Sequence, residues 1–316
     1  MNEYTILLQQ NPKPADVPEF HQCGFLFNDY NHLRQQDEGY LYLLTALNKT
    51  TRRADARCAF FIRSNEAVSP QAAPFGSIEF SKTLPEPVLV NFLDLLVETA
   101  RTVDVASLRI VNYPNCYAPE QASLLTTHLI NHGFRIRETS QTFFLPITAN
   151  PFEQTITPAE RRRLHKCREA GFQFMHWKTP DISKVIEFLQ GTRYQKGYPL
   201  TIAPEKLTNL LRGFPNHVSV FTVNDGVKPI ALTVAVRVRE DIVYNFLPAS
   251  HPAYHTFSPM VMLIGELFAY CQKQKIKLLD LGVSLDDNHQ PKPSLIRFKR
   301  NLGAQESPKL VFEKLF

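Results

Sequence analysis

Near its end the chain reads KLLDLG (residues 277–282), continues through a polar loop, and then reads PSLIRFKRNLG (residues 293–303). The first segment predicts a buried strand, and the proline that opens the second segment predicts the first turn of a helix. At about 100° per residue, the apolar side chains of this helix share one arc, formed by Leu295, Ile296, Phe298 and Leu302. Lys299 lies inside the arc. Since burying an ammonium without an anion is costly, Lys299 either extends its amino group past the core to water or binds a ligand.

The composition is that of an ordinary globular protein. The 316 residues are 44% hydrophobic and 21% charged, and this length predicts two domains. A net charge of +5 favours an anionic substrate or a nucleic acid as partner. The 5 cysteines are widely spaced without a Cys-x-x-Cys pair, which argues against a disulfide framework, and no His or carboxylate spacing indicates a metal site. The N-terminus has no basic leader and no apolar run is long enough to span a membrane, so we expect a cytoplasmic protein.

Both halves of the chain repeat one order of elements: strand, helix, strand, helix, strand. The sequence predicts strands at 57–63, 75–80, 107–113, 141–147, 217–223, 229–238, 242–247, 277–282 and 309–315 and helices at 86–101, 120–133, 182–193, 204–212, 259–274 and 293–301. The strand at Ser107 has its counterpart at Lys277 and the strand at Phe143 has its counterpart at Leu310, in both cases about 170 residues later. This offset indicates a duplicated αβ domain. We therefore predict tandem domains at residues 1–150 and 151–316, divided near three prolines, Pro146, Pro151 and Pro158.

The helix expected at 259–274 is apolar on nearly every side, which predicts that it is buried. Ser258 is a suitable N-cap residue and Pro259 suits the first turn. The positive end of this helix would follow the strand at 242–247, where it can receive an anion or a polarised carbonyl. An N-cap that only satisfies its own amides is the simpler interpretation.

A second group of cations occurs at residues 161–168, which read RRRLHKCR. On a helix, the apolar members share one side and the cations spread over the rest. Arg162, Arg163 and Lys166 could therefore hold the phosphates of a diphosphate or of an RNA backbone. A solvated helix face explains the same pattern. No aromatic residues are interleaved, so the pattern does not indicate sequence-specific reading of single-stranded RNA.

Several short motifs resemble one known family. They are LDLGVS (279–284), FKRNLG (298–303), the basic helix at 161–171, and LINHGF (129–134) followed by FFL (143–145). Together they are similar to the FemAB-type branch of the GNAT acyltransferase superfamily. The resemblance implies an α/β (α+β) fold of two tandem GNAT-like domains, each a mixed, mostly antiparallel sheet flanked by helices, with the active site in the C-terminal domain.

The resemblance also implies transfer of an acyl or aminoacyl group from an activated ester or thioester onto a primary amine. The donor carbonyl would lie between two splayed strands, at 242–247 and 277–282. The candidate bases and proton donors are Asp280, His255, Tyr254 and Tyr244. The candidate substrate-binding residues are Lys299, Ser258, Ser284, Arg162, Arg163 and Lys166. Of these, Lys299 is the expected ligand for a phosphate or carboxylate.

The expected site for the acyl donor is where this chain departs from the superfamily that it resembles. GNAT enzymes that use coenzyme A usually hold its pyrophosphate on a Gln/Arg-x-x-Gly-x-Gly/Ala loop, whereas the corresponding residues 250–258 read SHPAYHTFS and contain no glycine. Proline removes an amide donor, so aminoacyl-tRNA, the donor of FemAB-type enzymes, fits this loop better than acyl-CoA. We expect no permanently bound cofactor. Two alternatives remain, an acyl-CoA-dependent N-acyltransferase and a catalytically silent GNAT-like module that binds an anionic ligand or RNA.

Overall fold

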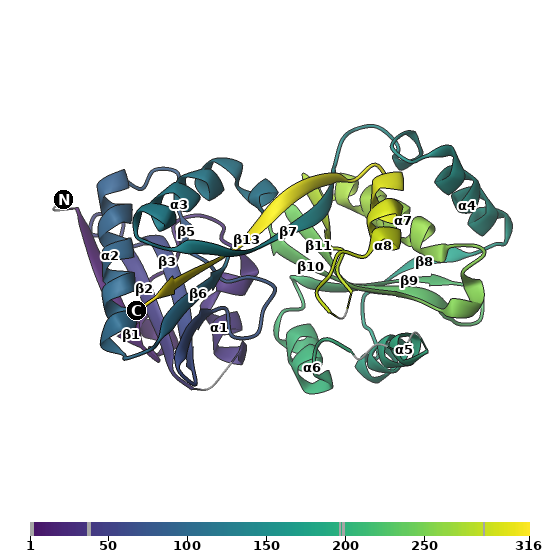
Figure 1. The fold of residues 1–316 in the computed structure, drawn as a ribbon. Coiled ribbons are helices and arrows are strands. Elements are labelled where there is room, and N and C mark those ends of the chain that lie inside the picture. Colours follow the sequence, from purple (N-terminus) through teal and green to yellow (C-terminus); the bar gives the residue numbers. More distant parts are fainter. Residues whose placement is uncertain (1–2, 37–38, 196, 198–199, 287) are drawn as a thin grey trace. The chain divides into compact units, whose positions relative to one another are not determined.

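The computed structural model describes residues 3–36, 39–195, 197, 200–286 and 288–316, and the chain forms two compact units (Figure 1). The N-terminal unit contains residues 1–140 and 307–316, and the C-terminal unit contains residues 141–306. The final ten residues of the chain therefore belong to the unit formed by its beginning.

The sheet of the N-terminal unit follows the order β1-β2-β3-β4-β6-β13, with the short strand β5 also paired to β3. Its strands are β1 (Tyr4–Gln10), β2 (Leu41–Asn48), β3 (Ala54–Arg63), β4 (Glu66–Ser69), β5 (Glu79–Phe80), β6 (Ser107–Val111) and β13 (Gln305–Leu315). The β4–β6 pair is parallel, whereas the pairs β1–β2, β2–β3, β3–β4 and β6–β13 are antiparallel. The strand expected at 75–80 is corrected to the two residues of β5, because the preceding segment packs Phe75 and Ile78 into the core without joining the sheet.

Helices cover both faces of this sheet. Side chains alternate across a strand, so Leu44 of β2 packs with α2 (Glu86–Thr102) and α3 (Pro119–Asn131), while Leu43 packs with Leu33 of α1 (Tyr30–Gln36). The α2–α3 face holds the larger cluster, which includes Phe92, Leu93 and Leu96. Both faces of the sheet are thereby buried.

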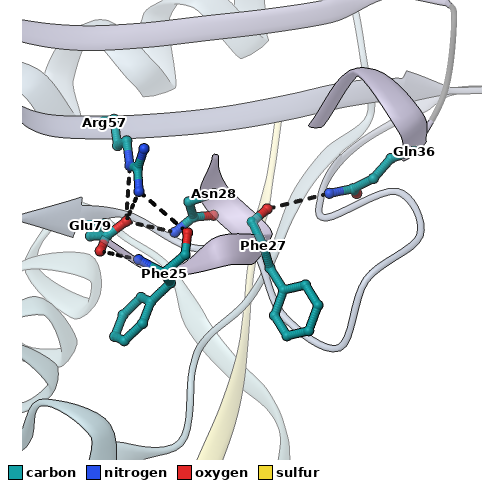
Figure 2. A network of polar contacts seen from close by, with 6 residues as sticks. All are labelled: Phe25, Phe27, Asn28, Gln36, Arg57 and Glu79. Carbon is teal, nitrogen blue, oxygen red and sulfur yellow. Dashed lines mark hydrogen bonds and ion pairs between the residues drawn. The ribbon is translucent and has the colours of Figure 1, made fainter. Parts of the chain in front are cut away.

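A nearly buried ion pair fastens the segment before α1 to this sheet (Figure 2). Arg57 of β3 donates two hydrogen bonds to Glu79, at 2.9 and 2.8 Å, and a third to the carbonyl of Phe25 at 3.3 Å. Glu79 in turn accepts from the amide of Phe25 at 2.8 Å and from Asn28 at 3.4 Å. A buried charge must be paired and hydrogen-bonded, and this network satisfies both members of the pair.

The sheet of the C-terminal unit follows the order β7-β12-β11-β10-β9-β8. Its strands are β7 (Arg135–Pro146), β8 (Gln173–Trp177), β9 (Val218–Asn224), β10 (Pro229–Arg239), β11 (Ile242–Ser250) and β12 (Leu278–Val283). Only the β11–β12 pair is parallel among these strands as described. Residues 230–236 of β10 are all buried, which is typical of a strand covered on both faces.

In Figure 1, α7 (Pro259–Lys273) and α4 (Pro158–Glu169) lie on one face of this sheet, and α5 (Ile182–Tyr194) and α6 (Pro204–Gly213) lie on the other. Nine of the 15 residues of α7 are buried, which confirms the burial predicted from its apolar sequence. The helix α8 (Pro293–Asn301) follows β12 and precedes β13. Five short 3-10 helices complete the described structure: η1 (Pro14–Asp16), η2 (Leu26–Asn28), η3 (Asn115–Tyr117), η4 (Phe152–Gln154) and η5 (Pro252–Tyr254).

The two units repeat one motif. In each, a parallel strand pair is joined through a crossover helix, as β4–α2–β6 and as β11–α7–β12, and a helix and a final strand follow. The final strands are exchanged: β7 pairs with β12 in the C-terminal unit, and β13 pairs with β6 in the N-terminal unit. For this reason the compact units do not coincide with the sequence halves 1–150 and 151–316. The predicted fold class, tandem mixed sheets flanked by helices, is confirmed. Among the described helices, none has both the length and the apolar character required to cross a membrane.

Candidate functional site

The strands β11 and β12 are paired only where they begin. Their parallel register joins Ile242 to Leu278 and ends at the third pair, Tyr244 and Asp280, although β11 continues to Ser250. A bulge at Phe246 shifts the register between β11 and β10 just beyond this point. The two strands therefore separate in the segments where the family resemblance implied a splay, and the facing backbone edges beyond Tyr244 are not joined to each other.

A cavity of about 460 Å³ occupies the place where the strands separate. The ends of β11 and β12 form two of its walls. Residues from α5, α7 and α8, among them Arg193, Met260 and Phe298, contribute the others. This volume lies within the range typical of small-molecule sites, and every residue of the lining belongs to the C-terminal unit.

Lys299 lies in the wall of this cavity with only 5% of its surface exposed. Its ammonium group donates hydrogen bonds to the carbonyls of Gly282 and Val283, both at 2.8 Å, and lies 5.4 Å from the centre of the Phe143 ring. Burial lowers the pKa of Lys299 to about 7, and the negative charge of Asp280 opposes this shift. The amino group therefore holds the end of β12 from the α8 side and does not extend to water.

Asp280 fixes the same strand end from within the sheet. One of its carboxylate oxygens accepts a hydrogen bond from the Thr142 hydroxyl at 2.9 Å and another from the amide of Gly282 at 2.6 Å. Gly282 has a φ of 73°, and an added Cβ would lie 3.1 Å from the Tyr244 ring, so a side chain is disfavoured there by both backbone strain and space. This turn of the backbone directs the Gly282 carbonyl to Lys299.

Two further polar side chains predicted from the sequence lie in this region. Tyr244 lines the cavity, and burial, followed by the negative charge of Asp280, raises its phenol pKa above the usual value. Its hydroxyl therefore stays protonated and can donate a hydrogen bond or a proton. Ser284 is 3% exposed, and its hydroxyl has no hydrogen-bond partner among the described residues. Buried hydroxyls are rarely left unpaired, so Ser284 has capacity for a ligand or a water molecule.

Ser258 also lines the cavity, but its local structure differs from the prediction. It precedes α7 in the left-handed conformation, with φ 56° and ψ 59°, and its side chain makes no capping hydrogen bond. The predicted N-cap position is therefore correct, but the Ser258 side chain does not cap the helix. The Ser258 amide instead donates to the carbonyls of Tyr254 and His255, so this residue closes the preceding turn. Its left-handed backbone then leads into α7.

The remaining predicted catalytic residues lie outside the cavity lining. The Tyr254 hydroxyl donates a hydrogen bond to the carboxylate of Asp225, which lowers the pKa of Asp225 to about 2 and raises that of Tyr254. His255 is exposed, and its ring lies 3.2 Å from the carbonyl of Pro252. Of the predicted residues, Lys299, Tyr244 and Ser258 line the cavity. Asp280 lies behind the lining, where it binds the amide of Gly282, and Ser284 directly follows the lining residue Val283.

The cations of α4 are also outside this lining, and several are engaged within the unit. Arg163 pairs with Glu160 at 2.7 Å, and the amino group of Lys166 lies 4.6 Å above the Phe257 ring. Arg168 pairs with Glu153 at 2.6 Å, and Arg162 is exposed. The Arg163 pair lies within α4, whereas Lys166 and Arg168 contact residues outside it. These contacts reduce the number of cations that a phosphate could bind without first breaking an existing interaction.

The loop between β11 and α7 uses its own amides. The amide of Ala253 donates to the His251 ring, that of Tyr254 to the carbonyl of His251, and that of His255 to the carbonyl of Pro252. The amides of Phe257 and Ser258 likewise donate to carbonyls within the loop, and the prolines that flank this segment have no amide hydrogen. Few amides remain to form a cradle for a pyrophosphate.

In the N-terminal unit, aromatic side chains fill the corresponding end of the β4–β6 pair. Phe75 follows β4 and Tyr113 follows β6, and their ring centroids are 6.2 Å apart. Phe25 packs against both rings, at 5.4 and 4.9 Å, and Tyr117 packs against Phe75 and Phe25, both at 5.7 Å. All four side chains are buried. The described part of the chain also contains no cluster of three or more side chains suited to bind a metal ion.

Comparisons with known proteins agree with this geometry. Residues 160–300 match the family described as an acetyltransferase (GNAT) domain. The crystal structure of FemX has a TM-score of 0.71 at 12% identity, with 94% of this chain and 93% of that chain covered. The C-terminal domain of a putative lysylphosphatidylglycerol synthetase from Agrobacterium fabrum has a TM-score of 0.59 at 12% identity, with 82% and 81% covered.

A tandem GNAT protein from the clavulanic acid biosynthesis pathway has a TM-score of 0.50 at 11% identity, covering 87% of this chain and 82% of that chain. No curated protein matches the sequence. At these identities the structural likeness establishes the fold. The matched domain agrees with the GNAT part of the resemblance for residues 160–300, and the fold of FemX agrees with two GNAT-like units.

Proposed function

We propose that this chain, with its GNAT domain at residues 160–300 and the fold of FemX, is an amide-forming transferase that moves an aminoacyl group from an ester of tRNA to a primary amine. The observation that carries the proposal is the cavity between the separated ends of β11 and β12, with the buried Lys299 in its wall. A carbonyl that enters between the strands meets backbone edges that are not joined to each other. Such edges can polarise it for attack.

The reaction asks for few protein groups. The neutral amine nitrogen attacks the ester carbonyl, and a C–N bond forms as the C–O bond to the ribose breaks. The nitrogen gives up one proton, to water or a base, and the leaving oxygen takes one up. Tyr244 is the candidate donor of that proton, since its phenol lines the cavity and is held protonated by burial. Lys299 and Asp280 are positioning residues. Lys299 donates to the carbonyl of Gly282 and Asp280 accepts from its amide, so together they fix the end of β12 where the substrate carbonyl would bind. Ser284, with its unpartnered hydroxyl, is a candidate contact for the substrate.

The loop at residues 251–258 supports tRNA over coenzyme A as the carrier of the acyl group. Its amides are engaged within the loop, so a pyrophosphate would have to break these hydrogen bonds before it could bind there. An aminoacyl ester at the 3′ end of tRNA has no pyrophosphate, so it could bind without breaking these hydrogen bonds. Arg162, Arg163 and Lys166 of α4 remain candidate contacts for the RNA backbone.

A thermal-shift experiment tests the donor. The protein is heated with acetyl-CoA, with a hydrolysis-resistant amide analogue of aminoacyl-tRNA, or with uncharged tRNA. A ligand at 100 times its dissociation constant adds about 2.7 kcal/mol of stability. We expect the aminoacyl analogue to stabilise the protein more than uncharged tRNA does, and acetyl-CoA to leave the transition unchanged. Stabilisation by acetyl-CoA alone would replace the proposal by a thioester-dependent N-acyltransferase. Equal stabilisation by charged and uncharged tRNA would favour a module that binds RNA without catalysis.

A further inference from the structure

A second and larger cavity lies in the C-terminal unit, outside the candidate active site. Its volume is about 700 Å³, and it is enclosed by α5 and by the ends of β8, β9 and β10. None of the residues predicted to act in catalysis or in substrate binding belongs to its lining. This size is sufficient for a ligand of drug-like dimensions.

The interior of this cavity is apolar. Met175 and Trp177 of β8 line it, and Phe188 of α5 and Leu232 of β10 complete the apolar surface. Trp177 is the only tryptophan of the chain. Aromatic and thioether side chains of this kind bind planar or aliphatic apolar groups without strict geometric demands.

The lining of the cavity includes two cations. Lys184 of α5 and Lys228 at the start of β10 contribute ammonium groups, and Glu187 contributes one carboxylate. Lys184 is 71% exposed at its side chain and lies 3.9 Å from Asp181, a distance at which an exposed pair contributes little. His251 adds an imidazole to the same lining. Lys184 and Lys228 are therefore the candidate contacts for an anionic group of a ligand.

The rim is also held in place before a ligand arrives. The hydrogen bond from Tyr254 to Asp225 joins the η5 turn, which follows His251, to the β9–β10 turn that carries Lys228. Within that turn, Asp225 accepts hydrogen bonds from the amides of Val227 and Lys228, both at 3.0 Å. A preformed rim reduces the ordering cost of binding.

We propose that this cavity binds a small amphipathic anion, namely an aromatic or aliphatic group with a single carboxylate. The apolar body lies against Trp177 and Phe188, and the carboxylate lies at the rim beside Lys228 and Lys184. The inference does not depend on the transfer reaction. Thr192 of α5, which is buried, lines both this cavity and the one between β11 and β12, so the two cavities meet at one residue.

The single tryptophan makes binding directly measurable. The intrinsic fluorescence of Trp177 is recorded while naphthalene-1-carboxylate is added, then its uncharged amide, and then dodecanoate. We expect saturable quenching by naphthalene-1-carboxylate, with at least tenfold weaker binding of the amide, because one charge-assisted contact is lost. Dodecanoate tests whether an aliphatic body replaces the aromatic one, by competing with the naphthalene probe.

Gly191 offers a way to block the cavity without weakening the helix. It lines the cavity within α5, and an added Cβ there meets nothing within 4 Å. We expect Gly191→Leu to fill the space and abolish quenching, while Gly191→Ala leaves binding within about twofold. Since leucine and alanine both favour helix over glycine, α5 should remain folded in both variants. A thermal transition no lower than that of the native protein confirms this.

Charge is tested by a matched pair of lysines. Lys228→Met should weaken binding of the carboxylate about tenfold and leave binding of the amide unchanged. Lys178 is an exposed lysine next to Trp177 and does not line the cavity. Lys178→Met should therefore change the affinity for neither the carboxylate nor the amide. The proposal is overturned by the absence of saturable quenching, by equal affinity for the carboxylate and its amide, or by quenching that survives Gly191→Leu.

Discussion

Replacement of Lys299 by methionine gives a pH-dependent change in stability that follows from its burial. The pKa of Lys299 is lowered from the usual 10.5 to about 7, so between these values the unfolded chain binds a proton that the folded protein does not. The stability of the native protein relative to Lys299→Met must therefore rise with pH through this window. It is constant below about pH 6, where the lysine is protonated in both states.

The magnitude follows from the same two pKa values. Integrating the difference in bound protons from pH 6 to pH 9 gives roughly 2.5 kcal/mol in favour of the native protein at the higher pH. At every pH the variant also lacks two buried hydrogen bonds, to the carbonyls of Gly282 and Val283, each of which costs about 1 to 3 kcal/mol when left unmade. This loss is the same at both pH values and adds to the pH-dependent difference. We therefore expect Lys299→Met to be clearly destabilised at pH 9 and much less so at pH 6.

Urea unfolding followed by tryptophan fluorescence measures this difference, because Trp177 belongs to the C-terminal unit and so reports on the unit that contains Lys299. Lys273→Met, which removes an exposed lysine of α7, serves as the control and should follow the native protein at every pH. A stability difference between the native protein and Lys299→Met that is constant or falls from pH 6 to pH 9 would refute the burial of an ammonium at this position.

Three further predictions concern other parts of the structure. Glu79→Gln breaks the nearly buried pair with Arg57 and should destabilise the N-terminal unit by about 3 kcal/mol, measured by urea unfolding and circular dichroism. Glu120→Gln, on the surface, should leave the unfolding transition unchanged. Equal stability of the two variants would contradict the role assigned to the Arg57–Glu79 pair. Gly282→Ala should lower the free energy of unfolding by about 1 to 2 kcal/mol more than Gly226→Ala does. Both glycines have positive φ, but only an alanine at position 282 would contact the Tyr244 ring. Equal losses of stability would show that this contact does not destabilise the variant. Tyr254→Phe should raise the pKa of Asp225 from about 2 towards its usual value in an NMR titration and leave donor binding unchanged, and loss of donor binding would return Tyr254 to the active site.

Strongly patterned elements were predictable from the sequence. The apolar helix at 259–273 and the alternation of strand and helix in both halves indicated a duplicated αβ domain, because their periodicity reflects burial directly. The mixed, mostly antiparallel sheets were implied by the family resemblance. The strands at 4–10, 41–48, 66–69 and 173–177 were not predicted. The exchange of β7 and β13 was not predicted either, because the periodicity of a strand indicates which face is buried and carries no information on its neighbour.

The site was predicted in part for the same reason. Lys299 and Asp280 belong to elements with a clear pattern, so the anomaly of a cation on an apolar arc was visible in the sequence. Tyr254 and His255 lie in and after a short turn, and the partner that engages Tyr254, Asp225, is 29 residues earlier in the chain. Arg193 lines the candidate active-site cavity and was not predicted, since nothing in the pattern of α5 separates it from a surface arginine.

Transfer itself is the most direct test of the account. The protein is mixed with tRNA charged with a radiolabelled amino acid and with a pool of small primary amines, and the label that remains in acid-soluble, alkali-stable form is counted, because an ester is hydrolysed by alkali and an amide is not. We expect label in an alkali-stable product that depends on the native protein, with unlabelled acetyl-CoA giving no competition. Label that stays in alkali-labile form in the presence of every amine, or product formation from acetyl-CoA in place of charged tRNA, would contradict the assignment of the β11–β12 cavity as a tRNA-dependent amide-forming site.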